Sequence, residues 1–272
     1  MAQSIYAITH PMKRCLLLHT FLLLTFTAWS QAPRITDHNA IGWWVYMGDH
    51  SLNKRLKLHT EYQWRRINFV QHWQQALARV GLLYDVRKNL SVGGGYTHFT
   101  TYPYGKHPVA DQEVPTYEHR LYEDVQWSGS LAAAELQHRI RLEQRWMGEP
   151  GHKSQSGMES WEYASRIRYQ LEIQYPLQGK TLEDQEFYLT ALDELFLNLG
   201  QDDNVYNQNR LLGGLGYQFT KDFQVELGYL HQISRHTDPD PVSQRPVYEI
   251  NRGFRLTLQY NLNFAKTQLE NK

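Results

Sequence analysis

Polar and apolar side chains alternate with a period of two in almost every segment after residue 41. This is the period of a β-strand, whose successive side chains point to opposite faces. No segment sustains the 3.6-residue period of an amphipathic helix, so the alternation predicts a single all-β domain. The expected strands cover residues 41–48, 54–66, 77–87, 90–104, 117–128, 131–148, 160–177, 182–199, 208–220, 223–236 and 248–264.

The connections between these strands alternate in length. Tight turns are expected at residues 88–89, 128–130, 179–180 and 221–222, and longer polar stretches lie near 67–76, 105–116, 149–159, 201–207 and 237–247. Long strands, short turns on one side and long loops on the other are typical of an outer-membrane barrel. The sequence therefore favours an antiparallel up-and-down transmembrane β-barrel, with a meandering soluble barrel as the alternative.

The two faces of the strands differ in composition. Segments 139–146 and 166–175 place arginine and glutamate on one face and mostly isoleucine, leucine and tyrosine on the other. Lysine falls mainly in the turns and the tail, whereas the planar arginine fork suits pairing with carboxylates across strands. We therefore expect the Arg/Glu face to line a lumen and the Leu/Tyr/Phe/Trp face to contact lipid. The last expected strand ends near Phe264, as the aromatic closing strands of outer-membrane barrels do.

Two features do not fit an antiparallel outer-membrane barrel. Eleven strands are expected, whereas single-chain bacterial barrels have an even number. Either segment 41–48 lies partly inside the barrel or residues 32–40 add a strand, so we expect ten to twelve strands. Glu123 and Asp193 also fall on the predicted lipid face.

The N-terminus has the features of an export signal. Lys13 and Arg14 precede an apolar run over 15–28, and residues 28–30 match a small-x-small cleavage pattern. We expect a cleaved signal peptide over 1–30, an outer-membrane barrel over 31–264 and a short tail over 265–272, with a membrane anchor as the alternative to the signal. The mature chain then has no cysteine, which excludes thiol catalysis, disulfides and Cys-based zinc sites.

Charge and hydrophobicity exclude two other classes of protein. The 28 basic and 28 acidic side chains balance, so the chain lacks the concentrated basic surface of a nucleic-acid binder. No stretch of about 20 apolar residues exists outside the N-terminus, which excludes a helical membrane protein.

Several motifs recur in an order that resembles a known family. They are Trp43-Trp44, residues 61–65 (EYQWR), 118–120 (EHR), 139–146 (RIRLEQRW), 166–169 (RIRY), 193–198 (DELFLN) and 207–210 (NQNR). The chain resembles the domain-of-unknown-function family 2490 (DUF2490), whose members are regarded as predicted bacterial outer-membrane β-barrel proteins. The resemblance implies the fold and the location. It supplies no activity and no catalytic residues.

The expected lumen face carries a ladder of charges. Its members are Arg120, Arg139, Arg141, Glu143, Arg145, Arg166, Arg168, Glu172, Glu194 and Arg210. One hypothesis is that they neutralise one another and tie the strands together, with Glu143 and Glu172 beside arginines of the facing strand. The other is a narrow permeation path, or a site for a small solute, lined by arginine.

Two histidines suggest hydrolysis as an alternative chemistry. His98 with Thr100, and His231 with Ser234, place a histidine and a hydroxyl on one strand face, as an outer-membrane lipid hydrolase acting at the rim requires, but a third partner is missing. No metal-binding motif is found, and we expect no catalytic residues, metal or cofactor. The sequence favours a monomeric structural envelope protein or narrow pore in contact with outer-membrane lipid, with the rim hydrolase as the alternative.

Overall fold

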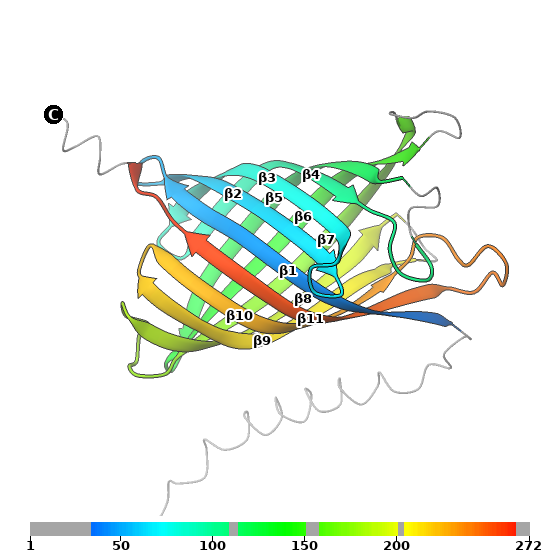
Figure 1. The fold of residues 1–272 in the computed structure, drawn as a ribbon. Coiled ribbons are helices and arrows are strands. Elements are labelled where there is room, and N and C mark those ends of the chain that lie inside the picture. The colour runs from blue at the N-terminus through cyan, green and yellow to red at the C-terminus, as the bar shows by residue number, and fades with distance from the viewer. Residues whose placement is uncertain (1–33, 109–113, 151–157, 201–203, 265–272) are drawn as a thin grey trace, which may run out of the picture. The chain divides into compact units, whose positions relative to one another are not determined.

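The computed structural model describes residues 34–108, 114–150, 158–200 and 204–264. Its elements are eleven β-strands that close into one barrel within the unit Ile35–Lys272 (Figure 1). In the described part of the chain, no helix has the length and apolar character needed to cross a membrane. The strands are β1 (Ile35–Ser51), β2 (Leu56–Ile67), β3 (His72–Arg87), β4 (Leu90–Thr101), β5 (Thr116–Leu131), β6 (Ala134–Pro150), β7 (Met158–Pro176), β8 (Glu186–Leu199), β9 (Tyr206–Thr220), β10 (Phe223–Arg235) and β11 (Val247–Tyr260).

The barrel closes by a parallel pairing of its first and last strands. Each strand is antiparallel to its neighbour in sequence, but β1 and β11 pair in parallel from Ile35 opposite Val247 to Met47 opposite Gln259. Figure 1 shows these two strands, blue and red, side by side. Ten reversals between eleven strands return the chain to its starting direction, so the closing pair has to be parallel. The expectation of a fully antiparallel barrel was wrong, and the sheet is mixed.

The first strand explains the odd number. Residues expected either to lie inside the barrel or to form a twelfth strand belong instead to one continuous wall strand, Ile35–Ser51. Its extra N-terminal residues pair with β11, which satisfies backbone groups that a shorter strand would leave open. The expected turn at 128–130 is also wrong, because those residues continue β5 and the chain reverses at 132–133, where Ala132 has a φ of 55°.

The connections define two ends of the barrel. Residues 52–55, 88–89, 132–133, 177–185 and 221–222 connect strands at what we call the short-turn end. Residues 68–71, 102–115, 151–157, 200–205 and 236–246 connect them at the long-loop end. The expected lengths were wrong at two places, because the tight turn expected at 179–180 is the longer connection 177–185, and the long stretch expected near 67–76 is only 68–71. The N-terminal end of β1 lies at the long-loop end and the C-terminal end of β11 at the short-turn end, as an odd number of strands requires.

Alternation along the strands separates the inside of the barrel from the outside. On β8, alternate residues from Glu186 to Asn198 are buried, and nearly all of those between them are exposed. Arginine, glutamate and glutamine dominate the buried set, whereas leucine, tyrosine, valine and phenylalanine dominate the large exposed side chains. Glu123 and Asp193 are exposed on the outer face, as the alternation indicates.

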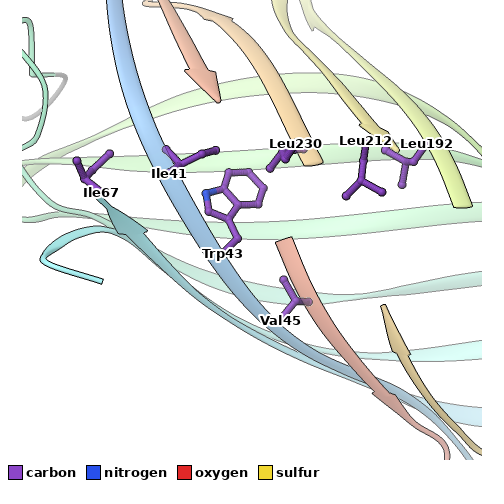
Figure 2. Packing of buried hydrophobic residues seen from close by; sticks show 7 residues of the cluster. All are labelled: Ile41, Trp43, Val45, Ile67, Leu192, Leu212 and Leu230. Carbon is purple, nitrogen blue, oxygen red and sulfur yellow. The ribbon is translucent and has the colours of Figure 1, made fainter. Parts of the chain in front are cut away.

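A smaller set of apolar side chains fills part of the interior. Figure 2 shows the Trp43 indole within a cluster formed with Ile41, Val45, Ile67, Leu192, Leu212 and Leu230. The cluster draws on β1, β2 and β8 to β10, so it lies along the wall that contains the parallel closure. The Leu/Tyr/Phe/Trp face of the strands was expected to contact lipid, whereas the Trp43 ring packs inside the barrel.

Packing at the closure predicts a sensitive glycine. A Cβ added to Gly253 of β11 would overlap the carbonyl oxygen of Ile41 on β1, whereas a Cβ at Gly213 of β9 would meet no atom within 4 Å. We expect Gly253→Ala to lower the free energy of unfolding by about 3 kcal/mol, because a rigid backbone has to move. Gly213→Ala is the matched control and should leave stability nearly unchanged. Urea unfolding midpoints of the folded barrel measure both, and equal midpoints would contradict the close approach of β1 and β11.

Candidate functional site in the barrel interior

Two glutamates each hold several guanidinium groups inside the barrel. Glu143 on β6 accepts hydrogen bonds from Nε and Nη2 of Arg166, at 3.0 and 2.6 Å, and from Nη1 of Arg168 at 2.6 Å. Glu143 is only 1% exposed, so these charge-assisted bonds form away from water. Glu194 on β8 also accepts from Arg168, which therefore bridges the two carboxylates.

Glu194 collects two further arginines from other strands. Nη2 of Arg139 on β6 lies 2.9 Å from Glu194 Oε1, and Nη1 of Arg210 on β9 lies 3.3 Å from Oε2. The sheet register explains this convergence, because Glu194 is the direct neighbour of Arg210 and of Gln170, which in turn lies beside Arg139. Three guanidinium groups thus share one carboxylate.

The remaining charges of this region form smaller groups. On β5, Glu118 accepts from Nε of Arg120 at 2.7 Å and from Nε of Arg145 at 2.5 Å. Asp124 accepts from Nε and Nη2 of Arg141, both at 2.5 Å.

Elsewhere around the wall the pairing is one to one. Arg79 on β3 pairs with Glu61 on β2, and Arg255 on β11 lies 2.9 Å from Glu226 on β10. These two ion pairs join neighbouring strands, with Glu61 directly opposite Arg79 and Glu226 diagonal to Arg255 in the sheet register.

Buried aromatic rings support the arginines. The guanidinium carbons of Arg166, Arg168 and Arg210 lie 4.9, 4.5 and 4.6 Å from the ring centre of Phe196, which is 1% exposed. Such cation–π contacts stabilise a cation that has lost its water. Phe196 has the same strand parity as Glu194 and Asn198, so its inward position could have been read from the alternation.

A second group of rings links arginines of different strands. Arg65 on β2 lies 3.8 Å from the centre of the Trp43 ring, and Arg210 lies 5.1 Å from the same ring. Arg65 also lies 5.5 Å from the Phe99 ring, which Arg120 contacts at 4.1 Å. The sequence patterns did not assign these inward-facing aromatics a role.

The structure places all ten residues of the expected ladder on the inward-facing side of the strands. The hypothesis placed Glu143 and Glu172 beside arginines of the facing strand, and Glu143 does pair with Arg166 and Arg168 of β7. Arg141 pairs with Asp124 of β5. Glu172 has no ion pair among the described residues, and it accepts hydrogen bonds from Gln170 at 3.3 Å and Gln174 at 3.1 Å. The other nine residues of the ladder make ion pairs.

A chamber of about 1100 Å³ occupies the short-turn half of the interior. Its lining begins at the short-turn rim, with residues such as Lys88, Ala132 and Lys221, and ends at Trp43 and Arg210. None of its lining residues in the described part of the chain belongs to the long-loop rim. The chamber is therefore open at one end, and the buried network and the apolar cluster fill the interior beyond it.

Residues 102–108, which follow β4, lie against the filled end. Tyr104 packs against the apolar cluster, and its hydroxyl donates to Oε2 of Glu249 at 2.9 Å. The backbone N–H groups of Lys106 and His107 donate to Oδ2 of Asp37 at 2.7 and 3.2 Å. Burial and the Glu249 carboxylate raise the pKa of Tyr104 well above its ordinary value, so its hydroxyl remains a donor.

The histidine and hydroxyl pairs do not assemble a hydrolase site. His98 lies on the outer face, 5.3 Å from the His119 ring, and no hydrogen bond joins it to Thr100 in the described residues. His231 and Ser234 are three residues apart, so in an extended strand they point to opposite faces, and the expectation that they share a face was wrong. Among the described residues, no three His, Cys, Asp or Glu side chains gather so as to hold a metal ion.

Comparison with known proteins yields one match. The model of a family described as a protein of unknown function (DUF2490) matches residues 41–243. No curated protein and no solved structure matches the chain.

The sharing of Glu194 by three arginines predicts an asymmetric response to charge removal. Glu194→Gln should lower the free energy of unfolding by about 3–5 kcal/mol, because it leaves buried guanidinium charges without their carboxylate. Glu172→Gln is the matched control, since Glu172 is an interior carboxylate without an ion pair in the described residues, and it should change stability little. Urea unfolding measures the loss of stability in both variants. Similar losses would mean that the ion pairs of Glu194 stabilise the barrel no more than the hydrogen bonds of Glu172 do.

Proposed function

Because the chain belongs to the DUF2490 family of proteins of unknown function, we propose its role from the geometry of the barrel. We propose an outer-membrane protein of the bacterial envelope that is exported by a signal peptide over 1–30, residues that lie outside the described part of the chain. Its barrel is held together by interior ion pairs and is closed at the long-loop end. In this role it stabilises or organises the envelope and does not catalyse a reaction.

The proposal rests on one observation: charged side chains lie inside the barrel and large apolar side chains lie outside, which inverts the distribution in a water-soluble protein. Buried charges fill the inside, whereas large apolar side chains such as Leu121, Leu189, Leu211 and Leu227 are 48–56% exposed on the outside. A continuous apolar outer surface is unfavourable in water, and it matches the apolar band of a membrane barrel.

Aromatic residues near both strand ends support the same location. On the outer face, Trp127 stacks on His138 towards the short-turn end at 4.8 Å, and Trp146 lies 5.5 Å from Tyr163 towards the long-loop end. His138 and Trp146 lie on β6, about 26 Å apart along the strand at roughly 3.3 Å per residue. A strand tilt of about 40° reduces this to roughly 20 Å along the barrel axis, close to the height of a membrane-barrel apolar band.

The location is tested by charges placed at two depths. Leu227→Arg, in the middle of the outer face of β10, should cost about 2–4 kcal/mol of stability in lipid vesicles. Leu131→Arg, at the short-turn rim, is the matched control and should cost roughly 0–1 kcal/mol. Folding titrations into vesicles measure both. Equal costs, or recovery of the protein in a soluble cell fraction, would refute the membrane location.

A gated narrow pore is the second candidate, and the chamber favours it. The chamber already crosses the short-turn half of the barrel, so only the interior between Trp43 and the Tyr104 loop separates it from the other side. The closed arrangement favours the envelope role in the resting protein.

Conductance in planar bilayers separates the two candidates. We expect the unaltered protein to show no stepwise conductance, and the double variant Trp43→Ala with Tyr104→Ala to conduct, because two rings are removed from the filled end. Trp161→Ala is the control, since this ring is 45% exposed on the outside. Conductance by the unaltered protein would establish the pore, whereas a silent double variant would show that other side chains close the barrel.

A further inference from the structure

The inner end of the chamber holds more positive charge than the protein itself compensates. Seven arginines are linked to one another by shared carboxylates and shared rings, namely Arg65, Arg120, Arg139, Arg145, Arg166, Arg168 and Arg210, and all of them except Arg145 and Arg166 line the chamber. In the described residues, the carboxylates within ion-pair distance of this group are three, Glu118, Glu143 and Glu194. The group is therefore not neutral, and it differs from the one-to-one pairs on other strands.

Arg65 is the clearest member of this excess. Its side chain is 2% exposed, yet it has no carboxylate within ion-pair distance in the described part of the chain. Its N–H groups donate to the amide oxygens of Gln63, at 2.8 and 2.6 Å, and of Gln75, at 2.6 Å. Burial of a full charge against neutral groups is costly, so a residue kept in this state has a use for the charge.

The excess charge is accessible from the short-turn end. Arg65, Arg120 and Arg210 all line the inner end of the chamber, and twelve Arg and Lys line it against seven Asp and Glu in the described residues. Arg141 also lines the chamber and is 1% exposed, and its Nη1 atom has no hydrogen-bond partner among the residues that the structure describes. The cavity therefore combines open volume, excess positive charge and a free buried donor.

We propose that the inner end of this chamber binds a small soluble oxyanion that carries phosphate or carboxylate groups and enters from the short-turn end. Planar guanidinium groups bind such oxygens in pairs, and the rings of Trp43 and Phe99 hold Arg65, Arg120 and Arg210 in place. The closed wall of strands keeps a lipid headgroup in the bilayer away from this site. The inference goes beyond the envelope role, because it concerns the chamber and holds whether or not the barrel lies in a membrane.

Inorganic pyrophosphate at constant ionic strength is the probe, and calorimetric titration of the full-length barrel folded in neutral detergent measures binding. We expect saturable binding by the unaltered protein and a loss of about ten- to a hundredfold in affinity for Arg65→Gln and for Arg210→Gln, as for loss of a charged donor. Lys54→Gln is the matched control, because Lys54 is an exposed lysine at the short-turn end that does not line the chamber, and this variant should bind almost as the unaltered protein does. Absence of saturable binding, or equal weakening by Lys54→Gln, would overturn the proposal.

Stability provides an independent readout. Pyrophosphate should raise the unfolding midpoint of the unaltered protein, and Arg65→Gln should unfold at no lower midpoint than the unaltered protein when no anion is present, because it removes an uncompensated charge. A purely structural Arg65 predicts a lower midpoint for the variant and no effect of pyrophosphate on either protein. If Arg65→Gln does not fold, the comparison is made with Arg210→Gln. If pyrophosphate raises the unfolding midpoint of that variant as much as it raises that of the unaltered protein, the site is refuted.

Discussion

Closure of the sheet is the constraint on which the rest of the barrel depends. Eleven strands joined by reversals can close only if the first and last run in the same direction, so β1 and β11 pair in parallel. That pairing extends β1 to Ile35 and brings its backbone against Gly253, where no side chain fits. Once closed, the sheet has no free edge, and every strand has one face in a confined space and one face outside.

The inward-facing side of the strands carries two kinds of residue, charged and apolar, which the period-two alternation alone does not distinguish. Charges gather mainly on β5 to β9, whereas the Trp43 cluster follows the wall that contains the closure. The two sets meet at Trp43, whose ring contacts Arg65 on one side and the apolar cluster on the other. The filled half of the barrel is thus a packed core, and the other half is an open chamber.

Charges are paired unevenly inside the barrel, because some arginines have a carboxylate of their own and others share one. The proposed anion site rests on this difference. The pairs Arg79–Glu61 and Arg255–Glu226 are self-sufficient and act as ties between neighbouring strands. Around Glu194 and Arg65 the arginines outnumber the carboxylates. Structural ties need no surplus of one sign, so the surplus points to an anion that the chamber receives.

The sequence by itself determined the fold class, the number of strands near eleven and the parity that turns arginine inwards. These follow from local geometry, because a period of two and the turn residues are properties of neighbouring positions. Only the tertiary structure decided the parallel closure, the partner of each arginine, the inward position of Trp43 and the end at which the chamber opens. Those depend on the register and curvature of strands that are not adjacent in the sheet, such as β6 and β8, whose Arg139 and Glu194 meet only because both pair with β7 in the observed register.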